Sequence, residues 1–273
     1  MTDQPLLGVP AMGKVTFSML GEALRRGWAD FKRAPGYGVV FASVYIVMGW
    51  GLAWITYISG QSYWLIFAAV GFPILGPFAA VGLYETSRRI ARGEPLDLYK
   101  IFGVVTAQGK RQLPSISAII IFMFLFWFFI AHMIFALFMG LSTMTNVSSS
   151  FEIYLTSEGL MMLAVGTVVG AGFALLLFMI TVISLPLLLD REVDFVTAMI
   201  TSFTVVSENF VPMVVWGAFI GVVTLVSMAP LFLGLFLTLP LLGHATWHLY
   251  ALICEAGEAY EADYTVATQA ETA

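Results

Sequence analysis

Residues of three kinds are scarce in this chain of 273 residues, and each shortage excludes a class of protein. Charged residues make up only 11% of the sequence, whereas a soluble domain needs roughly a quarter to form its polar surface. The single cysteine, Cys254, has no partner for an internal disulfide, so we expect a reduced side chain. Three histidines are too few for the ligand set of a respiratory oxidase core. No glycine-rich phosphate loop, zinc-protease motif or nucleophile elbow occurs, and we predict no catalytic residue.

Long apolar runs dominate the sequence instead. Apolar residues make up 60% of the chain and the mean hydropathy is +0.92. A helix needs about 20 apolar residues to cross the hydrocarbon core of a bilayer. We therefore predict an all-α, polytopic membrane protein with six transmembrane helices. The expected spans are Gly38 to Ile58, Tyr63 to Leu83, Ile116 to Leu141, Leu160 to Leu188, Val211 to Met228 and Leu231 to Ile253.

Two of these spans carry a further expectation. The fourth is longer than a bilayer requires, so it should tilt or bend, with Pro186 the expected position of the bend. No charge separates the fifth from the sixth. The stretch of residues 228–230, which contains Pro230, offers the only plausible turn between them.

The basic residues predict the orientation of the chain. All twelve Lys and Arg residues lie in three stretches, Lys14 to Arg33, Arg88 to Arg111, and Arg191 alone. Because short basic loops stay on the cytoplasmic side, six spans with both termini in the cytoplasm satisfy this pattern. Five spans, with an external C-terminus, would leave the basic loops equally well placed.

A threefold internal repeat is also suggested. Each basic region contains a short amphipathic segment that ends just before a proline at the start of a span: Pro35, Pro114 and Pro212. We expect three cytoplasmic interfacial helices with one apolar face each. Their apolar positions are Phe17, Leu20, Leu24, Trp28 and Phe31 in the first, Leu98, Ile101, Phe102 and Val105 in the second, and Val196, Met199, Ile200, Phe203 and Val206 in the third.

The whole chain is expected to form one membrane domain. Residues 1–37 should form the first interfacial helix, residues 38–253 the six-span bundle, and residues 254–273 an acidic, disordered cytoplasmic tail. Between the third and fourth spans, residues 142–159 form the only sizeable external loop. Its Phe151, Ile153, Tyr154 and Leu155 could lie on the outer membrane surface.

Three stretches of sequence resemble a known family. They are Gly76 to Glu85 followed by Ser87-Arg88-Arg89, Leu185 to Arg191, and Leu242 to Tyr250. Together they are similar to an uncharacterised family of bacterial integral membrane proteins, a domain of unknown function common in proteobacteria. The resemblance implies a location in the bacterial inner membrane and no particular activity. Family members usually carry further basic residues after the final Tyr, where this chain reads Ala251 to Glu255.

Few residues are candidates for a site. His244 and His248 share a helix face at i, i+4 spacing, which makes them weak candidates for metal ligands, although a structural role is the simpler interpretation. Glu85 and Asp190 follow proline-bearing spans beside Arg88 and Arg191. We expect them at the boundary, within reach of water, as helix-end ion pairs or as a cytoplasmic gate. Gly166 and Gly170 form a small-xxx-small pair, for packing within the bundle or for a homodimer seam.

The sequence therefore favours a non-enzymatic accessory, assembly or scaffold subunit. The expected partners are the lipid bilayer and another membrane protein, with a homo-oligomer as a further option, and neither nucleic acid nor a cofactor is expected. Two alternatives stay open. A small-solute transporter or channel would need a hydrated cavity near the proline-bearing segments, because no acid or base lies in the middle of any predicted span. A metal- or haem-binding redox component would need the histidines as ligands.

Overall fold

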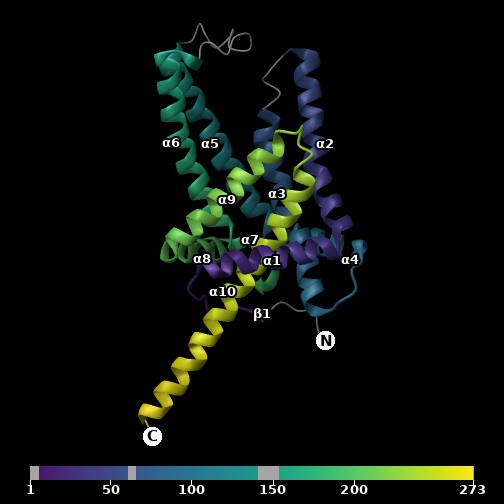
Figure 1. Cartoon of the computed structure of the whole chain (residues 1–273), viewed down its shortest axis with the longest axis vertical. Coiled ribbons are helices and arrows are strands. Elements are labelled where there is room, and N and C mark those ends of the chain that lie inside the picture. The colour runs from purple at the N-terminus through teal and green to yellow at the C-terminus, as the bar shows by residue number, and fades with distance from the viewer. Residues whose placement is uncertain (1–5, 61–65, 141–153, 273) are drawn as a thin grey trace.

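The computed structural model describes residues 6–60, 66–140 and 154–272. Over these ranges the protein is a bundle of helices (Figure 1). The elements in chain order are β1 (Leu6–Leu7), α1 (Phe17–Arg33), α2 (Pro35–Ser59), α3 (Ile66–Arg92), α4 (Leu98–Gln108), α5 (Leu113–Met139), α6 (Ser157–Thr181), α7 (Ser184–Asp190), β2 (Arg191–Glu192), α8 (Phe195–Glu208), α9 (Phe210–Met228) and α10 (Leu235–Thr272). The strands form one short parallel pair that joins the N-terminal segment to the residues after α7.

The helices confirm an all-α polytopic membrane protein. Five stretches are long and apolar enough to cross a bilayer: α2, α5, α6 with α7, α9, and α10 up to Tyr260. We count α3 as the sixth span, because it is 27 residues long and residues 66–83 contain no charge. The prolines that were expected to open spans lie in the first turns of α2, α5 and α9. A proline is tolerated there, because the first turn of a helix needs no donor from its backbone nitrogen.

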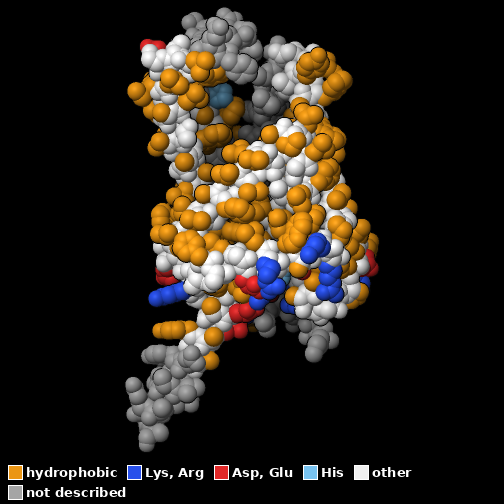
Figure 2. Space-filling model, viewed as in Figure 1, with side chains coloured by type: hydrophobic (Ala, Val, Ile, Leu, Met, Phe, Trp, Pro, Cys, Tyr) orange, Lys and Arg blue, Asp and Glu red, His pale blue; other side chains and the backbone are white. Residues whose placement is uncertain are grey.

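The three predicted amphipathic helices are α1, α4 and α8, and they lie at the same end of the bundle (Figure 1). Figure 2 shows Lys and Arg side chains gathered at this end, which we call the basic end. Each apolar face is divided between two environments. In α4, Ile101 and Val105 are buried against the bundle, whereas Leu98 and Phe102 remain more than 40% exposed. The element order of amphipathic helix and then two spans occurs three times, as the sequence repeat predicted.

The fourth span is broken, as its length and Pro186 predicted. Helix α6 ends at Thr181 and α7 begins at Ser184. A proline ring clashes with the carbonyl four residues earlier, which places the break at Val182. Ser202 of α8 satisfies the backbone groups freed by the break. Its hydroxyl accepts a hydrogen bond from the Ile183 amide at 3.1 Å and donates one to the Met179 carbonyl at 2.7 Å.

The fifth and sixth spans are separate helices, since α9 ends at Met228 and α10 begins at Leu235. Leu231 and Phe232 in the connection have positive φ angles of 52° and 66°, which is uncommon for residues other than glycine. The Trp50 indole of α2 donates a hydrogen bond to the Leu231 carbonyl at 2.7 Å and so joins this turn to the bundle.

The prediction of a disordered tail is wrong, because α10 continues to Thr272 and leaves the bundle at the basic end (Figure 1). The residues after Cys254 are rich in alanine and glutamate, which favour helix, and a helix that is already formed extends at little cost.

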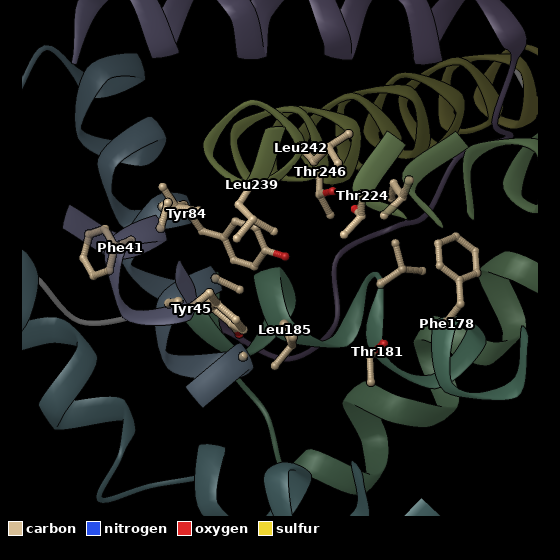
Figure 3. Close-up of a pocket in the computed structure, with 18 residues that line it drawn as sticks. Phe41, Tyr45, Tyr84, Phe178, Thr181, Leu185, Thr224, Leu239, Leu242 and Thr246 are labelled. Atoms are coloured by element: carbon tan, nitrogen blue, oxygen red, sulfur yellow. The ribbon is translucent and has the colours of Figure 1, made fainter. Parts of the chain in front are cut away.

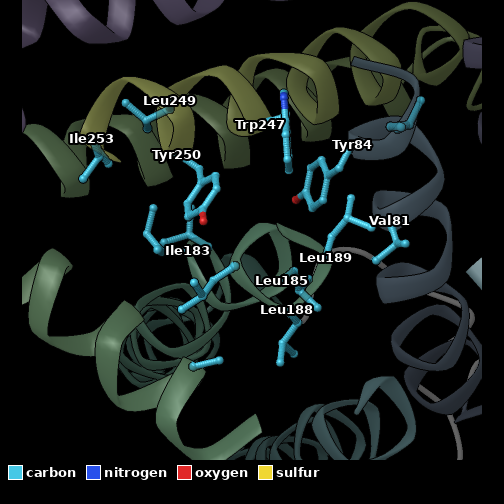
Figure 4. Packing of buried hydrophobic residues seen from close by; sticks show 14 of the residues in the cluster. Val81, Tyr84, Ile183, Leu185, Leu188, Leu189, Trp247, Leu249, Tyr250 and Ile253 are labelled. Atoms are coloured by element: carbon cyan, nitrogen blue, oxygen red, sulfur yellow. The ribbon is translucent and has the colours of Figure 1, made fainter. Parts of the chain in front are cut away.

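The hydrophobic core lies in the half of the bundle nearest the basic end. Figure 4 shows residues of α3, α7 and α10 meeting there, including Tyr84, Leu189 and Leu249. The spans differ greatly in how much of them the rest of the chain buries. In the most apolar 18-residue stretch of α10, 61% is buried, compared with 11% in the corresponding stretch of α5. At the end away from α1, the α5–α6 hairpin separates from α2 (Figure 1). The chain therefore packs tightly at the basic end and opens at the other end.

Candidate functional site: a central cavity beside a polar layer

Polar side chains from four helices form a largely buried layer near the basic end, which we call the polar layer. Its members are Asp30 of α1, Glu85, Ser87, Arg88 and Arg89 of α3, Asp190 of α7, and His244, His248 and Tyr250 of α10. All of the sequence-predicted polar candidates except Arg191 belong to it. Arg191, directly after α7, contacts Asp190 from the edge of the layer.

Glu85 is the most buried charge of the polar layer. Its side chain is 0% exposed and contacts the guanidinium groups of Arg88 and Arg89 at 2.7 Å each. Arg89 also reaches Glu94 at 3.4 Å. The expectation that water reaches Glu85 is wrong, because α3 packs against α2, α5 and α10 on several sides. Two positive partners compensate the loss of hydration that burial imposes on the carboxylate.

Asp190 connects the C-terminal end of α7 to α10. Its Oδ2 accepts a hydrogen bond from the Tyr250 hydroxyl at 3.0 Å and lies 3.2 Å from Arg191 Nε. Arg92 at the end of α3 lies 4.0 Å from Oδ1. These contacts join the C-terminal ends of α3 and α7 to the middle of α10; a gating role for Asp190 stays a prediction.

The two histidines of α10 contact different helices. His244 Nδ1 is hydrogen-bonded to Ser87 Oγ of α3 at 2.8 Å, and His248 Nε2 is hydrogen-bonded to Asp30 Oδ2 of α1 at 2.7 Å. His132 lies on α5 and bonds the Phe128 carbonyl within its own helix. Among the described residues, no group of three or more His, Cys, Asp or Glu side chains is arranged to hold a metal ion. In this arrangement His244 and His248 attach α10 to its neighbours.

A cavity of about 250 Å³ lies among α2, α3, α6, α7, α9 and α10, next to the polar layer (Figure 3). Leu185 and Leu239, each directly before a span proline, line it, and so does Gly76. Most of its wall is apolar, with Phe41, Phe178 and several leucines. We call it the central cavity.

Five hydroxyl groups interrupt the apolar wall of the central cavity. They belong to Tyr45, Tyr84, Thr181, Thr224 and Thr246. The Thr181 hydroxyl donates to the Leu177 carbonyl at 2.7 Å within its own helix. Those of Tyr84, Thr224 and Thr246 form no hydrogen bond with any described residue, and Figure 3 shows all three side chains directed toward the same space. Tyr84 and Thr246 are only 5% and 6% exposed.

The lining determines what the central cavity can do chemically. No Asp, Glu, Lys, Arg or His is found among its described lining residues. The wall therefore lacks the usual general acids, bases and anionic groups for acid–base catalysis or cation coordination. It can enclose an apolar group and offer hydrogen bonds to an uncharged oxygen atom.

The glycine pair on α6 has two different environments. A Cβ at Gly170 would lie 3.2 Å from Trp127 Nε1, so Gly170 lets α5 approach closely. A Cβ at Gly166 would meet no atom within 4 Å, so this glycine is not packed against a described residue. Cys254 is a half-buried free thiol on α10. The predicted external loop falls mainly on residues 141–153, which lie outside the described residues.

Sequence reasoning missed the most specific polar groups of the interior. It named neither Ser202, which completes the broken span, nor Thr224 and Thr246, which face the central cavity. In the sequence, each of these residues is visible only as a single serine or threonine within an apolar segment. Serine and threonine are common in membrane helices, however, where their hydroxyls usually bond their own backbone, so sequence alone could not separate these three from the rest.

Comparison with known proteins gives one match. Residues 65–190 match the model of a family described as "Predicted integral membrane protein (DUF2189)". This match confirms the resemblance to an uncharacterised family of integral membrane proteins and covers α3 to α7, the part of the chain that supplies Glu85 and Asp190. No curated protein and no solved structure matches the chain.

Proposed function

We propose that this integral membrane protein is a non-enzymatic accessory or assembly subunit of the bacterial inner membrane that acts by packing against a partner membrane protein. The observation that carries the proposal is the uneven burial of the spans. Helix α5 has 27 residues, yet only 11% of its most apolar window is buried within the chain, and its hairpin with α6 stands apart from α2. Phe122 and Phe129 on α5 are 68% and 66% exposed.

The arrangement of charge supports a binding role rather than a catalytic one. The buried charges of the polar layer pair with nearby charges: Glu85 with Arg88 and Arg89 within α3, Asp190 with Arg191, and Asp30 of α1 with His248 of α10. None of them lines the central cavity. Their contacts serve the fold, which leaves the open hairpin surface as the part of the chain that is available to a partner.

The expected orientation places the basic end, and both chain termini, in the cytoplasm. All twelve Lys and Arg residues lie in segments at or beside α1, α3, α4 and α8, and retention of short basic loops on the cytoplasmic side supports this orientation. The exposed hairpin would then meet its partner in the outer half of the bilayer.

Purification of the tagged full chain in a mild detergent tests the proposal. We expect one protein to co-purify in fixed stoichiometry, measured by native mass spectrometry. The variant Phe122→Ala/Phe129→Ala should lose it, whereas Tyr99→Ala, which removes an aromatic ring 87% exposed on α4, should retain it. A monomer that carries no partner under conditions that keep the chain folded contradicts the proposal.

Transport of a small solute is the second candidate. Its support is the position of the central cavity, which touches residues beside Pro186 and Pro240. The largely apolar wall favours an apolar or hydroxyl-bearing solute over an ion. Uptake of such a solute by proteoliposomes, lost in a variant that fills the cavity such as Thr246→Phe, would support transport.

A further inference from the structure

Two more cavities adjoin the central cavity along α6. The first, about 380 Å³, lies between α5, α6 and α9 and shares Phe178, Thr181 and Ile220 with the central cavity. The second, about 420 Å³, lies between α5 and α6 and shares Trp127 and Gly170 with the first. The three together form one path, which we call the crevice.

The dimensions of the crevice fit a hydrocarbon chain. Its lining along α6 runs from Met162 to Thr181, which corresponds to about 28 Å at the rise of an α-helix and nearly equals the thickness of a bilayer core, about 30 Å.

The two ends of the crevice differ in chemistry. The two cavities that adjoin the central cavity are lined almost entirely by apolar and glycine residues. No charged residue is among the described residues that line any of the three cavities. The central cavity, at the other end, carries the hydroxyls of Tyr84, Thr224 and Thr246, which face the cavity and form no hydrogen bond with a described residue. An oxygen atom of a ligand can accept a hydrogen bond from each of them. A phosphate group would find no cation there.

We propose that the crevice binds one long-chain neutral lipid. The hydrocarbon chain lies along α6, between α5 and α9, and an uncharged oxygen-bearing end group, a hydroxyl or a carbonyl, accepts hydrogen bonds from Tyr84, Thr224 and Thr246. The source of such a molecule is the bilayer itself, which surrounds the exposed α5–α6 hairpin. This site goes beyond the accessory role and needs no partner protein.

Photolabelling of the purified full chain tests the site. The probe is a long-chain alcohol that carries a diazirine in its chain, and its phosphate monoester serves as the charged comparison. We expect the alcohol to label peptides of α5, α6 and α9 at the lining positions, with labelling competed by unlabelled alcohol. The phosphate ester should label these peptides at least tenfold less.

The glycines of the crevice supply matched variants. A Cβ at Gly166 or Gly221 would meet nothing within 4 Å, and both residues line the crevice, so Gly166→Leu and Gly221→Leu should fill it without displacing a helix. We expect each to reduce labelling at least tenfold. Gly172→Leu is the control, because Gly172 is equally open, lies on the same helix and does not line the crevice.

A further variant tests the polar end. Thr246→Val keeps the shape of the side chain and removes its hydroxyl, so it should weaken competition by the alcohol about tenfold while the protein elutes and melts like the unchanged chain. Labelling spread over the exposed face of α2, or unchanged in Gly166→Leu, overturns the site. Equal labelling by the phosphate ester, or no effect of Thr246→Val, overturns the assignment to a neutral lipid. All of these measurements use the purified chain alone, so their outcome does not depend on whether a partner protein exists.

Discussion

Helix α1 crosses the basic end in direct contact with α10, and one glycine makes that contact possible. A Cβ at Gly27 would lie 2.7 Å from the backbone nitrogen of Ala245 and 2.9 Å from its Cα. Backbone cannot rotate out of the way as a flexible side chain can. We therefore predict that Gly27→Ala displaces α1 from α10, whereas Gly21→Ala, where a Cβ meets nothing within 4 Å, does not.

The magnitude follows from two opposing effects. Alanine favours a helix over glycine by roughly 0.5–1 kcal/mol, so Gly21→Ala should leave the protein equally stable or slightly more stable. At Gly27 the helices must separate by about 0.7 Å to reach an ordinary contact of 3.4 Å. A gap of this size removes about a quarter to a half of the dispersion attraction across the contact. With overpacking costs of about 1–3 kcal/mol, we expect Gly27→Ala to lower the free energy of unfolding by about 1–2 kcal/mol.

Two measurements on the purified full chain check this prediction. Unfolding in detergent gives the free energies, and hydrogen exchange of the α1 amides reports its attachment directly. Faster exchange in α1 should accompany the loss of stability in Gly27→Ala, since Asp30 and its bond to His248 lie one turn further along α1. If both variants match the unchanged chain in stability and in α1 exchange, the close approach of the two backbones is refuted.

Four other predictions concern the polar layer, the exposed ion pair of Glu22 and the topology. Tyr250→Phe removes the hydroxyl that bonds Asp190 and should cost about 0.5–1.5 kcal/mol in detergent unfolding; unchanged stability would show that the bond is not formed. Glu85→Gln removes a fully buried charge between two arginines and should cost about 3 kcal/mol. Glu22→Gln is its control, because that ion pair is solvent-exposed and should change stability little. The hydrogen bond from Arg25 lowers the pKa of Glu22 to about 2 from its ordinary 4.5. The contribution of this pair to stability is therefore fully present above pH 4.5 and is lost as the pH falls toward 2. The helix content measured by circular dichroism should stay constant from pH 8 to 5. Reporters that work only in the cytosol should be active at both chain ends, and a silent reporter on an expressed protein would contradict the six-span topology.

Most of the architecture could be predicted from local patterns. Apolar runs of about 20 residues marked the spans, prolines marked their first turns, and the apolar positions from Phe17 to Phe31 marked α1. The break before Pro186 was predictable for the same reason, because a proline ring acts on the carbonyl four residues earlier in its own helix. Each of these features depends on residues close together in the chain.

The predictions that the structure contradicts concern features that depend on contacts between distant residues or on the helix that precedes a segment. Glu85 follows an apolar span, so its position along the sequence suggested a boundary in water, yet α3 packs against α2, α5 and α10 and Glu85 is fully buried. The tail after Cys254 was expected to be disordered from its charge, whereas α10 extends through it, because a helix that is already formed propagates easily.

The sequence by itself determined that this is an all-α membrane protein with several spans and in which stretches its basic residues gather, because hydropathy and charge act through the solvent around each segment. Only the tertiary structure decided that His244 bonds Ser87, that His248 bonds Asp30, and that threonines of different spans share one cavity. Those pairings join residues up to 218 positions apart, and they depend on how the helices rotate and cross when they pack, which no local pattern of residues records.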